Sequence, residues 1–186
     1  MRYGLVRALM LGLAVLGLSS ALTVNAAEPP LRSTLDAAAL QTPYHQWKLQ
    51  QWRTRQDAPL SRFMNDPDMR MALLTRVYQE AHLAGLPPDL VLALIQVESA
   101  FKADAVSSAG AVGLMQIMPF WVAELGLPMD DLTEPNRNLR YGSTILAHYL
   151  AVERGDFTRA LARYNGSLGQ TWYPERVLKA WRDHWR

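Results

Sequence analysis

The chain has 186 residues, of which 49% are hydrophobic and 19% are charged, and it contains no Cys. This composition excludes collagen-like, low-complexity and disulfide-rich proteins and indicates one globular domain of ordinary kind. The 19 Lys and Arg outnumber the 17 Asp and Glu by two, but Arg2 and Arg7 supply this excess before the first acidic residue, Glu28. The rest of the chain is neutral. Proteins that bind nucleic acid or anionic membranes through charge carry a basic excess, so we expect neither partner.

The first 26 residues have the three-part plan of a secretory signal peptide. Arg2 and Arg7 precede an uncharged apolar run over residues 8–18, and small or polar residues follow up to Ala26. The alternative is a membrane anchor, but an anchor needs roughly 20 apolar residues and this run has about half that number. We therefore expect cleavage after Ala26, export, and a mature protein with no integral membrane segment.

Residues 27–66 are polar and aromatic, and four Pro residues interrupt any long periodic pattern in them. We interpret this segment as an N-terminal extension that contains one modest helix over residues 44–55. Residues 67–186 then form the main domain, which we expect to be monomeric.

Two helices are predicted directly after residue 66. Asp66 and Pro67 suit the start of a helix, apolar residues then recur at steps of three and four, and Gly85 ends the pattern. Pro88 opens the next helix, in which nearly every residue from Leu90 to Val97 is apolar. A helix with no polar face is typically buried on all sides.

The remaining chain predicts a loop and further helices. Small residues from Lys102 to Gly113 favour a loop or a short hairpin. Helices are predicted over 120–125, from Pro135 to near Gly155, over 157–164, and from Pro174 onward; in the last, Trp181 and Trp185 have the spacing of core residues. The predicted fold class is therefore mainly α, a single globular domain of about six to seven helices.

Glu98 is the candidate for chemistry, because it places a carboxyl group in the most apolar helix, within LVLALIQVESAF. Burial penalises the charged form and raises the pKa, so such a group can hold a proton near neutral pH and donate it. Cleavage of a glycosidic bond needs a positioned acid of this kind. The alternative is a structural Glu that is paired with an Arg or caps a neighbouring helix.

The segment ALIQVESAFKADAVSSAGAVGLMQIMP resembles the core signature of the Slt-type lytic transglycosylases, a glycoside hydrolase family (family 23) with a goose-type lysozyme-like fold. Three blocks match in the family's order: Glu98-Ser99, Gly113–Gln116 followed by Pro119, and Tyr164-Asn165-Gly166. A looser match is NLRYGSTILAHYL, which starts at Asn138, and the resemblance covers roughly residues 70–170. Arg163 and Ser167 depart from the family's pattern around the last block, which leaves substrate preference open.

The resemblance implies an exported peptidoglycan lytic transglycosylase in which Glu98 is the catalytic acid and then the base. It implies that the other matched residues bind substrate: Ser99, Met115, Gln116, Tyr164 and Asn165. Three of them have an alternative structural interpretation, with Met115 and Tyr164 in the core and Asn165 at a helix end. Trp121 and Trp172 are candidates for a groove wall that packs against sugar rings.

In the related family, one carboxyl group suffices because the substrate supplies the second. The acetamido oxygen of N-acetylmuramic acid assists departure of N-acetylglucosamine, and the C6 hydroxyl of the same sugar closes onto C1 to give a 1,6-anhydro end. The resemblance therefore implies no metal and no organic cofactor, and the sequence shows no clustered His ligands.

Two alternatives stay open. A hydrolytic goose-type muramidase would need a second acid, for which Asp104 is the nearest candidate in sequence. A cell-wall-binding module of a secretion or assembly machine could use residues 27–66 to contact its partner. In each case the expected partner is the peptidoglycan glycan strand and the expected location is the periplasm.

Overall fold

The computed structural model describes residues 38–125 and 131–186, so the predicted signal peptide over residues 1–26 lies outside the described part. Within these ranges the chain forms seven α-helices and a final π-helical turn, and no β-strand: α2 (Pro43–Leu60), α3 (Pro67–Leu83), α4 (Pro88–Ser99), α5 (Phe120–Glu124), α6 (Pro135–Val152), α7 (Phe157–Asn165), α8 (Trp172–Ala180) and η1 (Trp181–Trp185). The mainly α prediction is confirmed. None of the described helices is long and apolar enough to cross a bilayer.

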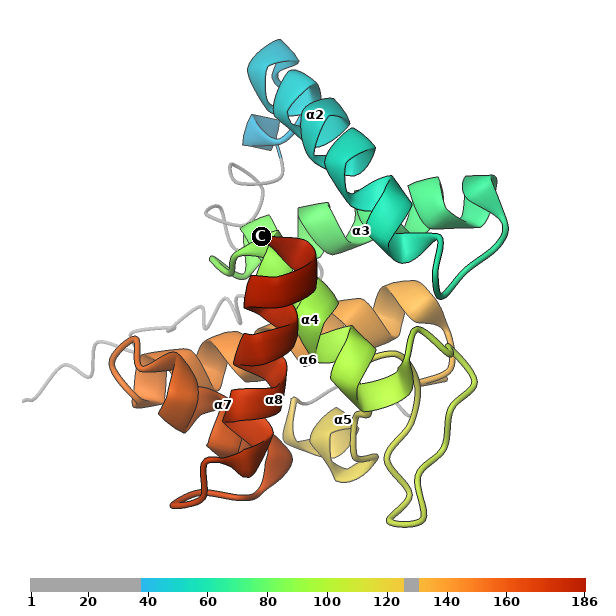
Figure 1. Cartoon of the computed structure of the whole chain (residues 1–186). Coiled ribbons are helices and arrows are strands. Elements are labelled where there is room, and N and C mark those ends of the chain that lie inside the picture. Colours follow the sequence, from blue (N-terminus) through green and yellow to red (C-terminus); the bar gives the residue numbers. More distant parts are fainter. Residues whose placement is uncertain (1–37, 126–130) are drawn as a thin grey trace, which may run out of the picture.

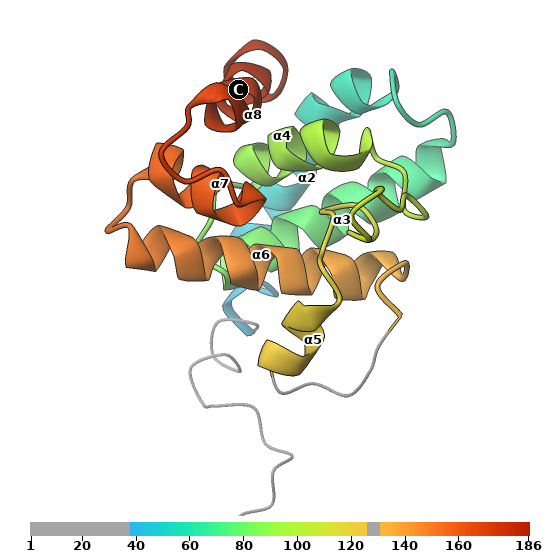
Figure 2. The same ribbon diagram turned by 90° about the horizontal axis from the view of Figure 1, so that it is seen from below.

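Helix α4 lies inside the domain, as its apolar sequence predicted. Every residue from Leu90 to Ile95 is fully buried. Helices α3 and α8 and the turn η1 pack against α4, and α6 packs against α3 and α7 (Figure 1). In Figure 2, α6 spans the width of the domain, with α7 beside one half of it. Glu98 lies three residues after this buried run, on a helix that several other elements hold in place.

The predicted helix starts are confirmed where a capping side chain precedes a proline. The Asp66 carboxylate accepts bonds from the backbone N–H groups of the first turn of α3, and Glu134 does the same for α6. In both helices Pro occupies a first-turn position, where its missing N–H group is not needed. These local signals fix the two helix starts without help from tertiary packing.

Two helices differ from their predicted bounds. Helix α2 continues to Leu60 instead of ending at residue 55, because Leu49, Trp52, Gln56 and Leu60 form a buried stripe at helical spacing. Helix α8 begins at Trp172 instead of Pro174, since a proline is tolerated in the first helical turn.

The loop predicted over residues 102–113 is confirmed and continues to residue 119. Val112 makes isolated antiparallel bridges to Val106 and to Ile117, so the loop folds back on itself twice without forming a strand. This loop connects the end of α4 to α5 and carries the Gly113–Gln116 block.

The predicted N-terminal extension contributes α2, and α2 packs on α3. The rings of Trp52 and Tyr78 lie 5.4 Å apart, and Arg70 Nε lies 2.6 Å from Asp57 Oδ1. Helix α2 thus shares the hydrophobic core with the helices that follow it. The domain boundary at residue 66 stays a prediction.

Candidate active site

Glu98 lies in the last turn of α4, where the apolar run ends. Ala100 caps the helix with φ 49°, and Phe101 follows with φ 65°. Two consecutive left-handed residues are uncommon outside glycine, and here they turn the chain sharply away from the helix axis. Glu98 is partly buried at this end of α4, which packs against α8, and its neighbour Ser99 is bonded to the 102–119 loop.

The pKa of Glu98 is raised to about 7, chiefly because burial disfavours the carboxylate. Two neighbours act in the opposite direction. The Tyr173 hydroxyl donates a hydrogen bond to Oε1 of Glu98, and the positive charge of Arg176 favours the ionised form. At neutral pH both protonation states are therefore populated, and the raised pKa agrees with the one predicted from the apolar helix.

Two buried tyrosine hydroxyls from the C-terminal helices surround this site. Tyr164 lies on α7 and donates to the carbonyl oxygen of Met115 at 2.8 Å. Tyr173 lies on α8. Burial raises the pKa of both Tyr164 and Tyr173 well above the ordinary value, and the nearby charge of Glu98 raises it further. Both phenols therefore stay protonated and can act as hydrogen-bond donors.

The Gly113–Gln116 block is clamped to its surroundings by two polar side chains. Ser99 Oγ donates to the carbonyl oxygen of Leu114 at 2.8 Å. Asn138 is fully buried on α6; its Oδ1 accepts from the backbone N–H of Met115 at 2.7 Å, and its Nδ2 donates to the carbonyls of Val112 and Leu132. These bonds fix the loop relative to Glu98.

Glycines allow the close approach on which this clamp depends. Gly113 has φ 80°, and a Cβ at this position would lie 2.2 Å from Asn138 Nδ2 and 2.5 Å from the carbonyl oxygen of Leu132. Gly142 on α6 lies against Met115, whose sulfur would be 2.4 Å from an added Cβ. No side chain larger than hydrogen fits at either position without a shift of its neighbours.

The structure brings four of the six predicted site residues together. Glu98 and Ser99 end α4, the backbone of Met115 accepts the Tyr164 hydroxyl, and Tyr164 lies near enough to Glu98 for their charges to interact. The side chain of Met115 is fully buried, so its backbone carbonyl is the group available to the site.

The other two predicted residues lie at the edge of this cluster. Gln116 has φ 50°, and its Nε2 donates to the backbone carbonyls of Ala105 and Gly113, at 3.1 and 2.9 Å. Asn165 is exposed at the end of α7, immediately before the left-handed Gly166 cap. The role of each in substrate binding stays a prediction.

Sequence reasoning missed Tyr173, Arg176 and Asn138. Tyr173 and Arg176 reach Glu98 because α8 packs on α4, and no local pattern in the sequence reports which helices pair. Asn138 lies within the looser family match NLRYGSTILAHYL, and that match was the available signal.

The alternative of a structural Glu98–Arg ion pair is not what the described residues show. The bond to its carboxyl comes from the Tyr173 hydroxyl, and Arg176 acts on it by charge at longer range. Asp104 lies exposed in the loop.

The tryptophans divide between core and surface. Trp185 is 1% exposed, which confirms its predicted core position, whereas Trp181 is partly buried and packs against Phe157 at the edge of the core. Trp172 is 47% exposed and its ring lies edge-on to Tyr173, 5.8 Å away, next to the Glu98 partner. Trp121 is half-buried, edge-on to Tyr149. Of the two predicted wall residues, Trp172 offers the more open ring.

Comparison with known proteins gives consistent relatives. The chain is 35% identical to the transglycosylase of Enterobacteria phage PRD1 over 101 residues, which are 50% of this chain and 37% of the phage protein. It is 48% identical over 46 residues to membrane-bound lytic murein transglycosylase C of Actinobacillus pleuropneumoniae, which is 25% of this chain and 13% of that enzyme. The chain thus spans well under half the length of these relatives.

An inactive mutant of lytic transglycosylase Slt from Pseudomonas aeruginosa aligns with 83% of this chain and 25% of its own, with a TM-score of 0.47 and 28% identity. The profile of the family described as "Transglycosylase SLT domain" matches residues 77–180, more than half of the chain. This match spans Glu98, the Gly113–Gln116 block, the Tyr164 block and Tyr173. The lysozyme-like part of the fold prediction stays what the resemblance implies. The chain belongs to the transglycosylase SLT domain family.

Proposed function

We propose that the protein is a peptidoglycan lytic transglycosylase that cleaves the β-1,4 bond between N-acetylmuramic acid and N-acetylglucosamine with Glu98 as its one carboxyl catalyst. The observation that carries the proposal is a partly buried carboxyl with a pKa of about 7, in contact with a tyrosine hydroxyl. Membership of the SLT family and the murein enzymes among its relatives support the substrate class.

In the first half-reaction Glu98 acts as the acid. Its proton passes to the glycosidic oxygen while the bond from that oxygen to C1 of N-acetylmuramic acid breaks. A positioned acid contributes about a hundredfold to ten-thousandfold to such a step. Because Oε1 accepts from Tyr173, the proton to be donated is carried by Oε2. The acetamido oxygen of the substrate stabilises the positive charge that develops at C1.

In the second half-reaction the Glu98 carboxylate acts as the base. It takes the proton of the C6 hydroxyl while O6 bonds to C1, which closes the 1,6-anhydro ring and restores the acid. No water enters the product. A pKa of about 7 suits both halves, since neither protonation state is strongly disfavoured at neutral pH.

The surrounding residues would hold the sugar and the carboxyl in place. The Tyr173 hydroxyl orients Glu98, and the Tyr164 hydroxyl fixes the carbonyl of Met115 at the site. Gln116, whose Nε2 is bound to the loop backbone, would present its amide oxygen to an N-acetyl N–H group. Ser99 would support the floor through Leu114, and Asn165 would contact the substrate from the end of α7.

A hydrolytic muramidase is the second candidate. It needs a carboxylate that activates water, and within the described residues the charged group that acts on Glu98 is the cation Arg176. Asp104, the candidate for that role, is exposed in the loop. The arrangement therefore favours the non-hydrolytic reaction.

The proposed location is the periplasm, after cleavage of the predicted signal peptide at Ala26. An active enzyme there could open the wall for a secretion or assembly machine. The alternative of a module in such a machine is therefore compatible with catalysis.

Mass spectrometry of sacculi digested with the purified mature protein tests the proposal. We expect muropeptides with 1,6-anhydro ends, and none from the Glu98→Gln variant. Products that have gained one water per cleavage would identify a hydrolase instead. The absence of any cleavage by the natural protein would leave only a binding module.

A further inference from the structure

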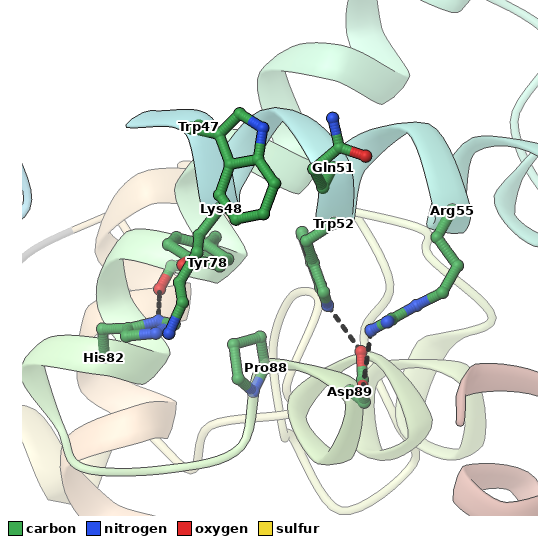
Figure 3. Close-up of a pocket in the computed structure, with 9 residues that line it drawn as sticks. All are labelled: Trp47, Lys48, Gln51, Trp52, Arg55, Tyr78, His82, Pro88 and Asp89. Atoms are coloured by element: carbon green, nitrogen blue, oxygen red, sulfur yellow. Dashed lines mark hydrogen bonds and ion pairs between the residues drawn. The ribbon is translucent and has the colours of Figure 1, made fainter. Parts of the chain in front are cut away.

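A groove lies at the opposite end of α4 from Glu98. It has a volume of about 550 Å³ and lies between α2 and the junction of α3 with α4 (Figure 3). Pro88 and Asp89 border it at the start of α4, nine residues before Glu98 in the same helix. At a rise of 1.5 Å per residue this places the groove about 14 Å along the helix from the catalytic carboxyl. Glu98 does not line it.

Trp47 lines the α2 side of the groove, and its side chain is not part of the buried core. Helix α2 is held to the core by its buried stripe, whereas Trp47 is 58% exposed and projects from α2 at the groove (Figure 3). The equally exposed ring of Tyr44 stacks on Trp47, with ring centroids 6.4 Å apart and planes 23° from parallel. The two rings together form an exposed aromatic surface, of which Trp47 lines the groove and Tyr44 does not.

One cation of the groove, Lys48, is available to bind a ligand. Asp89 on the floor is already bonded to Trp52 Nε1 and to the guanidinium of Arg55 (Figure 3). It also accepts a hydrogen bond from Gln56 Nε2. By contrast, Lys48 contacts the face of Tyr44, and among the described residues no carboxylate is paired with it. Because the carboxylate is satisfied and Lys48 is not paired with one, the groove favours an anionic group.

We propose that this groove is an accessory glycan site that binds a muramic-acid-containing stretch of peptidoglycan outside the catalytic site. The inference rests on the proposed function, which supplies the polymer. A sugar ring would pack on Trp47, its hydroxyl and amide groups would bond Gln51, and the ammonium of Lys48 would bind a carboxylate of the muramyl peptide. Its volume lies in the range of small-ligand sites, large enough for one or two sugar rings.

The groove also depends on an element outside the matched family region. Trp47, Lys48 and Gln51 lie on α2, whereas the family match begins at residue 77. Binding a polymer at two points raises its effective concentration at the catalytic site. The accessory site would therefore hold the enzyme on the wall between cleavage events, and it would assist cleavage of polymeric substrate alone.

Binding is measured with the full mature chain in a Glu98→Gln background, which cannot consume the ligand. The probes are purified sacculi, soluble muropeptide fragments, and oligomers of N-acetylglucosamine, which carry no carboxylate. We expect Trp47→Ala to weaken binding of all three about tenfold, the equivalent of about 1.4 kcal/mol. We expect Lys48→Ala to weaken binding of the first two about twofold to fivefold and to leave the uncharged oligomers unaffected.

Met69→Ala and Arg62→Ala are the matched controls, since they remove an exposed apolar side chain and an exposed cation that do not line the groove. Equal binding by Trp47→Ala and its parent overturns the glycan assignment and leaves the exposed aromatic surface to a protein partner.

Activity with Glu98 intact separates the two proposals. Trp47→Ala should raise the KM for sacculi, whereas Met69→Ala should leave KM and kcat at the parent values. If the natural protein releases no anhydro product, the proposed function fails; if it does so while the groove variants bind like the parent, the accessory site alone fails.

Discussion

The hydroxyl of Tyr173 donates a hydrogen bond to Oε1 of Glu98, across 75 residues of sequence and between two packed helices. Burial raises the pKa of Glu98, and this bond lowers it toward the value of about 7. The bond stabilises the carboxylate more than the acid, because the ionised oxygen is the better acceptor. Tyr173 therefore lowers the pH at which Glu98 changes from acid to base.

Replacing Tyr173 with Phe should raise the pKa of Glu98, because the stabilising bond is lost while the burial remains. In the natural protein kcat/KM should fall as the pH rises through about 7, where Glu98 loses its proton. In Tyr173→Phe this alkaline limb should lie at higher pH. The measurement is the pH dependence of kcat/KM for release of anhydro products.

Tyr164→Phe is the matched control for this experiment. It removes a hydroxyl that donates to the Met115 carbonyl and not to Glu98. We expect a loss of about 1 kcal/mol in the free energy of unfolding, and an alkaline limb at the natural position. If the alkaline limb of Tyr173→Phe stays at the pH of the natural protein, the Tyr173 hydroxyl does not lower the pKa of Glu98.

Glu98→Gln should abolish turnover and stabilise the fold at alkaline pH. The folded-state pKa of about 7 lies above the ordinary value of 4.5, so the folded state binds the proton more tightly than the unfolded state. The free energy of unfolding contributed by Glu98 falls as pH rises from 4.5 to 7 and then levels off. The variant should exceed the natural protein by about 1 to 3 kcal/mol above pH 7, since one pKa unit equals about 1.4 kcal/mol.

Urea unfolding at pH 4 and pH 8 checks this prediction. The two proteins should have equal stability at pH 4 and differ at pH 8. A difference that is the same at both pH values would mean that Glu98 does not titrate differently in the folded state.

Much of the fold was predictable because its signals are local. Asp66 and Glu134 with the prolines that follow them fix helix starts, and Gly166 fixes a helix end with φ 78°. The burial of α4 was readable because an all-apolar helix has no face to present to water. The identity of Glu98 as the candidate acid followed from the same run.

The rest depended on which helices pack together. Nothing near Tyr173 indicates that its hydroxyl reaches Glu98, because that contact exists only when α8 lies on α4. The continuation of α2 to Leu60 through Pro59 likewise follows from packing on α3, where burial of the side chains outweighs the poor helix propensity of proline. The groove at Trp47 was likewise not predictable, because residues of α2, α3 and α4 line it together.

Gly113→Ala should destabilise the loop of the candidate site. An added Cβ would collide with Asn138 Nδ2 and the Leu132 carbonyl, at 2.2 and 2.5 Å. We expect a loss of about 3 kcal/mol or more in the free energy of unfolding, together with lost turnover, because overpacking and a left-handed alanine both contribute.

Gly110→Ala separates these two contributions. Gly110 has a similar φ, 85° against 80°, but an added Cβ there meets no atom within 4 Å. It should lose only the conformational part, about 1 kcal/mol. Equal losses in the two variants, measured by urea unfolding, would show that the contact with Asn138 is not tight.

Asp104→Asn distinguishes one-carboxylate from two-carboxylate chemistry. Asp104 is exposed in the loop, so the substitution should leave the free energy of unfolding within about 0.5 kcal/mol of the natural value. If Glu98 is the sole carboxyl catalyst, turnover and the 1,6-anhydro product should both be unchanged. If Asp104 activated water, turnover should fall by about a hundredfold or more.

The measurement for Asp104→Asn is the rate and mass of products from sacculi, with Glu98→Gln as the inactive reference. A large loss of rate in Asp104→Asn would return the enzyme to the hydrolytic class, since a lyase that closes its own substrate's C6 hydroxyl onto C1 has no step for a second acid.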